Sequence, residues 1–208
     1  HQRIEAERIS IAVEDYVREL ERVLELTSKA HGFMSLHPPE QQNILEELIA
    51  YENRFEDLTL VDSDGKELIR SNRIQVVPQT ALVDRANDPV FQQVAKLKSN
   101  YFGPVQFDNV TGEPRIDIAI PLQSFHTGDI KFVLFGSVRL KKIWDLLDSI
   151  SRPDQSIFIV DGQGNIIGHP DPSVTLSGQK FQLPATTSGI SRGLNGEEVV
   201  MATKGLAF

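Results

Sequence analysis

Apolar and weakly polar residues recur every three or four positions along the first thirty residues of the chain. They are Ile9, Val13, Tyr16, Val17, Leu20, Leu24 and Thr27. This spacing is typical of an amphipathic helix, and neither Gly nor Pro interrupts it before Gly32. The pattern therefore predicts a helix from residue 2 to about residue 31, about 45 Å long. Because one compact unit does not need such a length, we expect a coiled-coil seam with a partner or a helix shared by two units.

Shorter periodic segments follow. The stretch PPEQQNILEELIAY predicts a helix that starts near Pro38, and ANDPVFQQVAKLKS predicts a second one with Asp88 as its cap and Pro89 at its first position. Apolar runs predict strands at 101–107, 114–122 and 131–140, and KKIWDLLDSI predicts an amphipathic helix at 141–150.

One pattern occurs twice, as LTLVDSDGKELIRSN at 58–72 and IFIVDGQGNIIGHPD at 157–171. In each copy an apolar run ends in Val-Asp, a Gly follows three residues after the Asp, and a second apolar stretch begins. An Asp that bonds its own backbone and a Gly at positive φ are typical of a hairpin turn. We therefore predict two β-hairpins and a duplicated unit. The alternative is that two hairpins share common turn residues by chance.

The order of elements predicts an α+β fold. Two strands, a helical crossover and three antiparallel strands would form a five-stranded PAS-like sheet with helices on one face. A second unit begins with the hairpin at 157, continues through a Pro- and Ser-rich stretch at 170–189 and a turn at 193–196, and has one strand at 198–203. We expect this unit to be incomplete at its C-terminal end, as in an excised piece of a longer protein.

Composition excludes several functions. The net charge of −8 argues against nucleic-acid binding, which needs a basic surface. The absence of cysteine excludes disulfides and thiolate chemistry. No run approaches the roughly 20 apolar residues that cross a bilayer.

No catalytic motif, cofactor motif or metal site is predicted. The histidines are His1, His31, His37, His126 and His169, and none has the spacing of a helical metal site. The Asp-x-x-Gly turns at 62–65 and 161–164 are too short for a calcium loop. We therefore expect a fragment that is not an enzyme and carries no metal or cofactor.

Several segments in this order resemble one known family. They are the long first helix, LTLVDSDGKEL, NYFGPVQF, GEPRIDIAIPL, FVLFGSVRLKKIWDLL and IFIVDGQGNIIGHPD. Together they are similar to the double Cache sensor domain, a tandem PAS-like domain found outside the membrane in bacterial and archaeal transmembrane receptors. The resemblance implies a spine helix at 1–36, a membrane-distal ligand module at 37–150 and a membrane-proximal module at 151–208. It also implies transmembrane helices on both sides of the fragment.

The resemblance further implies an extracytoplasmic sensor of a small molecule. The output that we expect first is a histidine kinase of a two-component system, with a chemoreceptor or a cyclic-dinucleotide enzyme as alternatives. We also expect a homodimer that packs along the N-terminal helix. A different alternative is a protein-binding module whose distal pocket is filled by its own side chains, for which the candidates are Phe102, Phe107, Phe132 and Phe135.

The chain departs from the family pattern at the positions that bind amino acids. Many members use Arg, Trp and Tyr at the start of the crossover helix and an Asp on the last strand of the distal module. Here residues 87–91 read Asn-Asp-Pro-Val-Phe and residues 134–137 read Leu-Phe-Gly-Ser. The sequence therefore does not support an α-amino-acid ligand, and the site has to be predicted from strand alternation.

Alternation in RIDIAI at 115–120 turns the isoleucines to one face of the sheet and Arg115, Asp117 and Ala119 to the other. If the isoleucines pack on the long helix, the charged face forms a concave pocket with the crossover segment. The predicted ligand-binding residues are Arg85, Asp88, Phe91, Tyr101, Arg115, Asp117, Phe135 and Ser137. Two alternatives stay open: Arg115 and Asp117 pair with each other on a solvated face, and Tyr101 belongs to the core.

Overall fold

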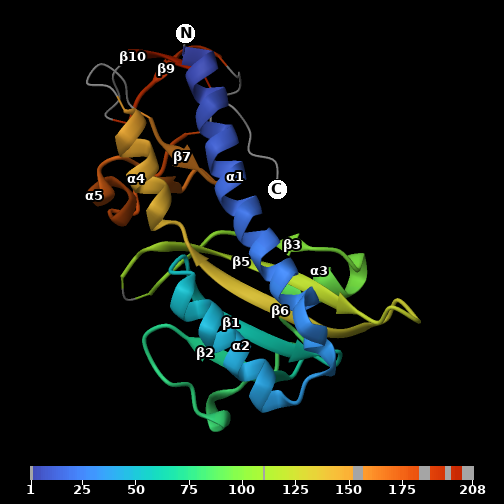
Figure 1. The fold of residues 1–208 in the computed structure, drawn as a ribbon. Coiled ribbons are helices and arrows are strands. Elements are labelled where there is room, and N and C mark those ends of the chain that lie inside the picture. Colours follow the sequence, from blue (N-terminus) through green and yellow to red (C-terminus); the bar gives the residue numbers. More distant parts are fainter. Residues whose placement is uncertain (1, 110, 152–156, 183–187, 195–197, 203–208) are drawn as a thin grey trace. The chain divides into compact units, whose positions relative to one another are not determined.

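The computed structural model describes residues 2–109, 111–151, 157–182, 188–194 and 198–202, which group into two compact units (Figure 1). We call residues 20–106 and 115–139 the first unit. The second unit consists of the described residues of 1–19, 107–114 and 140–208.

Helix α1 (Gln2–Lys29) begins the chain and continues as a short 3₁₀ helix, η1 (Ala30–Ser35). The apolar stripe predicted for it is buried within the chain, at Ile9, Val13, Val17, Leu20 and Leu24. The stripe is thus used for intramolecular packing, as expected of a helix that serves two units. Three large apolar residues of α1 stay exposed: Ile4, Ile11 and Leu26.

The other predicted helices are confirmed. They are α2 (Pro38–Tyr51), α3 (Pro89–Leu97) and α4 (Lys141–Ile150). The side chain of Asp88 caps α3 by accepting a hydrogen bond of 2.8 Å from the backbone N–H of Val90. The crossover segment thus ends where the sequence predicted, because Asp and Pro both favour the first turn of a helix.

An antiparallel sheet forms the centre of the first unit, in the strand order β2-β1-β6-β5-β3. Its strands are β1 (Phe55–Asp62), β2 (Glu67–Asn72), β3 (Tyr101–Phe102), β5 (Pro114–Gln123) and β6 (Ile130–Arg139), and β4 (Gln106–Phe107) also pairs with β5. This confirms the α+β prediction. The single strand predicted at 101–107 is wrong, because Gly103, Pro104 and Val105 separate β3 from β4. Pro104 has no N–H for a ladder, whereas the N–H of Gly103 still donates to the carbonyl of Asp117 at 2.8 Å.

One face of this sheet is apolar and packs against helices. Ile118 of β5 lies opposite Gly136 of β6, which lies opposite Leu58 of β1. A Cβ on Gly136 would lie only 2.8 Å from the side chain of Leu24, so α1 approaches the sheet closely at this glycine. The isoleucine face therefore packs against α1, which is the condition on which the predicted pocket depended.

The first repeated turn joins β1 to β2. Its Asp62 carboxylate accepts hydrogen bonds of 2.9 Å from the N–H groups of Asp64 and Lys66. The N–H of Gly65 donates to the carbonyl of Asp62 at 3.2 Å, and Gly65 has a φ of 94°. In turn the carbonyl of Gly65 accepts a hydrogen bond of 2.6 Å from the N–H of Arg85.

The second repeated turn, between β7 (Ile159–Val160) and β8 (Ile166–Gly168), repeats these contacts. The carboxylate of Asp161 accepts from the N–H groups of Gln163 and Asn165 at 2.8 and 2.9 Å. Gly164 has a φ of 81°, and its carbonyl accepts a hydrogen bond of 2.8 Å from the N–H of Phe181. Because turn and crossover contacts match in both copies, a duplicated unit explains the pattern better than chance does.

The first unit also contains a short 3₁₀ helix, η2 (Gln79–Ala81), and three further described elements belong to the second unit. They are α5 (Pro172–Leu176), β9 (Ser188–Arg192) and β10 (Glu198–Ala202). Helix α5 was missed within the Pro- and Ser-rich stretch, although Asp171 caps it as Asp88 caps α3. The predicted strand at 198–203 is observed as β10. Part of the predicted turn at 193–196 lies outside the described residues.

The turn glycine provides a test of this architecture. A Cβ at Gly65 would lie 2.6 Å from the backbone of Ala86, in addition to the strain of a positive φ. We expect Gly65→Ala to lower the free energy of unfolding of the domain by about 1–3 kcal/mol in urea denaturation. The control is Gly162→Ala in the second turn, where a Cβ has open space and which should change stability little. Equal stability of both variants would contradict the packing described here.

Candidate functional site

A cavity of about 140 Å³ lies on the charged face of the sheet in the first unit. Its walls come from β1, β2, β4, β5 and β6 and from the crossover segment. The lining residues are Asp57, Thr59, Arg70, Arg85, Asp88, Gln106, Arg115, Asp117, Phe135 and Ser137. All but Phe135 are polar or charged.

Strand register brings these side chains together. Thr59 of β1 lies between Arg70 of β2 and Phe135 of β6. Two residues further along these strands, Asp57 and Asp117 lie on either side of Ser137. Because side chains two residues apart on a strand share a face, both rows face the cavity.

The guanidinium of Arg70 is neutralised by Asp57. Its Nε and a terminal nitrogen donate to the two carboxylate oxygens at 2.9 and 3.2 Å, and the amide of Asn72 donates to the same carboxylate at 2.9 Å. The hydrogen bond from Arg70 to Asp57 raises the pKa of Arg70 above its ordinary value, against the opposing effect of burial. This cation is therefore already paired within the protein.

The guanidinium of Arg85 has two carboxylate partners. Its Nε donates to Glu67 at 2.6 Å, and a terminal nitrogen lies 3.3 Å from Asp88. The Glu67 side chain is fully buried and also accepts a hydrogen bond of 3.2 Å from the N–H of Val83. Arg85 lies over the ring of Phe135, 4.8 Å from its centroid, which adds a cation–π contact.

Arg115 and Asp117 differ from these pairs. The carboxylate of Asp117 accepts a hydrogen bond of 2.7 Å from the hydroxyl of Ser137. The Nε of Arg115 is buried and, among the described residues, has no hydrogen-bond partner. No ion pair joins Arg115 to Asp117 in the described part of the chain, so the alternative of a simple surface pair is wrong.

The structure separates the predicted site residues into two groups. Those that line the cavity are Arg85, Asp88, Arg115, Asp117, Phe135 and Ser137. Phe91 and Tyr101 instead pack in an apolar cluster with Val61, Val94 and Val133, which is the core alternative considered for Tyr101. Of the phenylalanines proposed to fill the pocket, only Phe135 contributes to the lining.

Four lining residues were not predicted: Asp57, Thr59, Arg70 and Gln106. Asp57 and Thr59 alternate with Leu58 and Leu60. This alternation indicates a strand that has two polar side chains on one face. The predicted hairpin began at residue 58, whereas β1 begins at Phe55, and Asp57 was therefore left outside.

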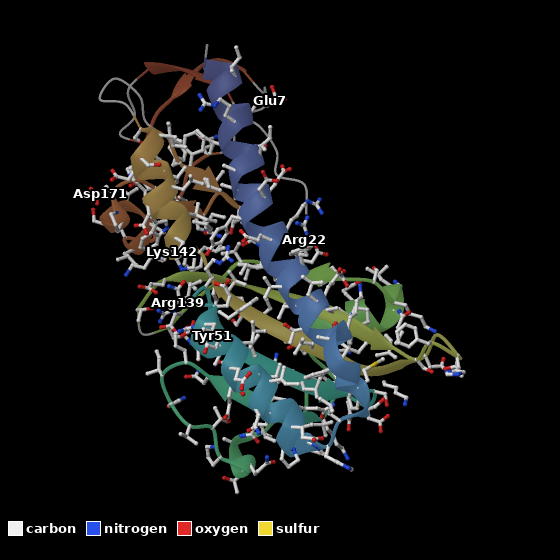
Figure 2. The ribbon with its side chains drawn as sticks, in the orientation of Figure 1. Glu7, Arg22, Tyr51, Arg139, Lys142 and Asp171 are labelled. Atoms are coloured by element: carbon white, nitrogen blue, oxygen red, sulfur yellow. The ribbon has the colours of Figure 1, made fainter. Side chains whose placement is uncertain are left out.

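No group of three or more His, Asp or Glu side chains among the described residues is arranged to hold a metal ion. His169 instead accepts a hydrogen bond of 2.9 Å from the N–H of Asp171. Asp171 lies at the start of α5 (Figure 2). No helix of the described part has the length and apolar character to cross a membrane.

The buried Glu67–Arg85 pair gives a testable prediction. Removal of one partner from a buried ion pair leaves the other charge uncompensated, so we expect Glu67→Gln to lower the free energy of unfolding by about 3 kcal/mol. In the exposed pair of Lys142 and Asp145 the side chains are 55% and 72% accessible, and Asp145→Asn should cost less than about 1 kcal/mol. Urea denaturation of both variants measures this difference, and equal losses would contradict it.

Solved structures with a similar fold are sensor domains of bacterial receptors. The ligand-binding domain of the Pseudomonas aeruginosa PAO1 amino acid chemoreceptor PctC, in complex with GABA, superposes with a TM-score of 0.68 at 18% identity, covering 97% of this chain and 91% of that one. That of PctB with L-Arg gives 0.69 at 20% identity, covering 97% and 86%. That of the Pseudomonas fluorescens chemoreceptor CtaA with L-isoleucine gives 0.69 at 17%, covering 98% and 85%.

At 17–20% sequence identity, the similarity to these solved structures establishes the fold alone. Family membership comes from a separate comparison, in which the model of the Cache domain matches residues 1–207. Cache domains are ligand-sensing domains that are typically extracytoplasmic parts of membrane receptors, and they are not catalytic. Since the match extends over nearly the whole sequence, this chain belongs to the Cache domain family.

Proposed function

We propose that the cavity of the first unit is the ligand site of this sensor domain and that its ligand is a small polar molecule. The observation that carries the proposal is the concentration of charged and hydroxyl side chains around a cavity of about 140 Å³ that is partly open to solvent. The ligand complexes of the similar chemoreceptor domains support a small ligand in a domain of this fold.

Size and polarity restrict the ligand. An engineered cavity of roughly 150 Å³ accepts benzene, so a space of about 140 Å³ is large enough to hold a small ligand or the head group of a larger one. The lining contains three arginines and three aspartates, whose charges cancel. A polar ligand of low net charge fits such walls, whereas an apolar one would leave them without hydrogen bonds.

Signalling would follow from a shift between conformations. A ligand changes such an equilibrium only by its different affinity for the two states. The ligand contacts proposed here include Arg85 and Asp88, which lie in the crossover segment, and Ser137 on β6. Closure of that segment on the ligand would bias the position of α1. We propose that 37–150 is the membrane-distal module, that 151–208 is the membrane-proximal one, and that α1 passes the bias to flanking transmembrane helices.

The output domain is a separate proposal. We propose a sensor histidine kinase first, from the resemblance of the sequence, and a chemoreceptor second, because the similar solved structures are chemoreceptor domains. Assays on the full-length receptor in membranes separate the two. Ligand-dependent autophosphorylation of the receptor itself supports the kinase, and ligand-dependent control of a separate kinase supports the chemoreceptor.

We propose a homodimer along α1, supported by its exposed residues Ile4, Ile11 and Leu26, which are 63%, 52% and 63% accessible. Sedimentation equilibrium of the domain should show association that Ile11→Glu weakens, because a charge would enter an apolar interface. The control is Val76→Glu, which replaces an apolar residue that is 95% accessible and lies outside α1. Monomeric wild-type protein at high concentration would contradict the dimer.

A cavity-filling substitution tests the ligand site. Ser137→Leu places an apolar side chain in the cavity and removes the hydroxyl that donates to Asp117, so a polar ligand should lose at least about 100-fold in affinity. The control is Ser149→Leu, at an exposed position of α4 in the second unit. Thermal-shift screening with anionic, cationic, zwitterionic and neutral polar compounds finds the ligand, and calorimetry measures its affinity.

Two results would contradict the proposed site. A compound that binds both serine variants with wild-type affinity binds elsewhere in the protein. If no compound of any class binds to the folded domain, the protein-binding alternative is favoured.

A further inference from the structure

The crossover segment and α1 lie on opposite faces of the sheet in the first unit. Helix α3 packs on the cavity face, where Val90 and Val94 join an apolar cluster that includes Phe135. Helix α1 packs on the other face, where the side chain of Leu24 approaches Gly136. The sheet therefore separates the segment that would close over a ligand from the helix that would carry the signal.

A route through the sheet would disturb its hydrogen bonds. Strand β6 is paired along both of its edges, with β1 on one side and β5 on the other. A shift of this strand against its neighbours would break several of these bonds, and each buried group left unpaired costs free energy. A contact at the edge of the sheet offers a route that leaves the pairing intact.

Asn100 makes a contact of this kind. It follows the end of α3 and directly precedes β3, which is the last strand in the order of the sheet. Its side-chain amide nitrogen donates to Oε1 of Glu21 and to Oε1 of Glu25, at 2.7 Å in both cases. Because the two glutamates are four residues apart on α1, they lie on one side of that helix. A single amide thus joins α1 to the chain that leaves α3.

The charges make this contact strong. Hydrogen bonds to an ionised acceptor are shorter and stronger than those between neutral groups. Two carboxylates four residues apart on a helix repel each other, and the shared donor offsets that repulsion together with Lys29, 3.5 Å from Glu25. Loss of the Asn100 amide therefore opens the contact and leaves two like charges side by side on α1.

The position of Asn100 follows the position of α3. Lys98 ends this helix in the left-handed conformation, with a φ of 52°, and its N–H donates to the carbonyl of Val94 at 2.8 Å. Only Ser99 separates Lys98 from Asn100. A displacement of α3 on the cavity face therefore moves the amide that holds α1 on the opposite face.

We propose that Asn100 is the positioning residue that couples the crossover segment to α1 around the edge of the sheet. A change at Arg85 and Asp88 then reaches α1 through α3, Asn100 and the two glutamates. The proposal rests on the proposed function, because it names the contact by which closure of the crossover segment on a ligand reaches α1. It does not depend on the identity of the ligand. Coupling of this kind is carried by contiguous contacts, and each contact of this route is observed.

NMR of the purified domain tests the coupling without a ligand. Glu67→Gln removes the carboxylate that holds Arg85, so it should shift the side-chain amide resonance of Asn100 and the backbone amide resonances of residues 20–29. In an Asn100→Ala background, the same substitution should leave the resonances of residues 20–29 in place. A residue that only stabilises the fold would not decide whether the shift reaches α1. Asp88→Ala, which removes the cap of α3, repeats the test if Glu67→Gln does not fold.

Urea denaturation provides a second measurement. Glu67 and Asn100 share no hydrogen-bond partner among the described residues, and substitutions at such separate sites normally have additive effects. We expect non-additivity instead: the unfolding constant of the double variant should be about tenfold smaller than the product of the single effects. The control is Gln123→Ala, which removes a hydrogen bond of 2.7 Å to the carbonyl of Lys98 at the same turn and should combine additively with Glu67→Gln.

Three results would overturn the coupling. They are no shift at residues 20–29 in Glu67→Gln, a shift there that persists in the Asn100→Ala background, and additive stabilities. A persisting shift would mean that the change passes through the sheet. These results leave the proposed ligand site standing, because the serine variants test it separately. Failure of every compound to bind would in turn contradict the ligand site and leave the coupling of Asn100 to α1 intact.

Discussion

Charged side chains buried on one face of a sheet need partners, and this requirement shapes the first unit. The strands β1, β2, β5 and β6 are apolar on the face that packs against α1 and α2, and they carry arginine, aspartate, serine and threonine on the other face. Glu67 is the most buried of the acidic groups, and its carboxylate binds the side chain of Arg85 and the backbone of Val83. The crossover segment is thereby held over the charged face, and the space that remains is the cavity.

The two copies of the duplicated unit show how one backbone arrangement supports different uses. In both, the N–H of a crossover residue donates to the carbonyl of the turn glycine. That residue is Arg85 in the first unit, where it lines a polar cavity. In the second unit it is Phe181, which is buried and packs edge-on against Phe158 at 4.9 Å between ring centroids. The described part of the second copy thus has an aromatic core contact where the first has a charge.

Much of this arrangement could be predicted because it follows from local rules. The period of β5 separated Arg115 and Asp117 from the isoleucines, and the Asp-Pro pair marked the start of α3. Contacts between distant segments could not be predicted in the same way. The partners of Arg70 and Arg85 depend on strand register and on the path of the crossover segment. No local pattern indicates that Arg70 is paired while the Nε of Arg115 has no hydrogen-bond partner among the described residues.

Errors in the prediction also have physical causes. Residues 101–107 read as one strand by their aromatic content, but Pro104 has no N–H for the ladder and residues 103–105 lie outside the strands. Helix α5 is short and lies in a segment whose composition resembles a loop, so only its Asp-Pro start indicated it. Phe91 and Tyr101 were assigned to the site for their aromatic character, yet they pack in the apolar cluster, where burial stabilises them.

The central claim is that the charged face of the first unit is the ligand site of this sensor domain. A crystal structure of the domain grown with the best-binding compound tests this most directly. We expect electron density for that compound in the cavity lined by Arg115, Asp117 and Ser137. Density at another place, or a cavity closed by protein side chains, would contradict the claim.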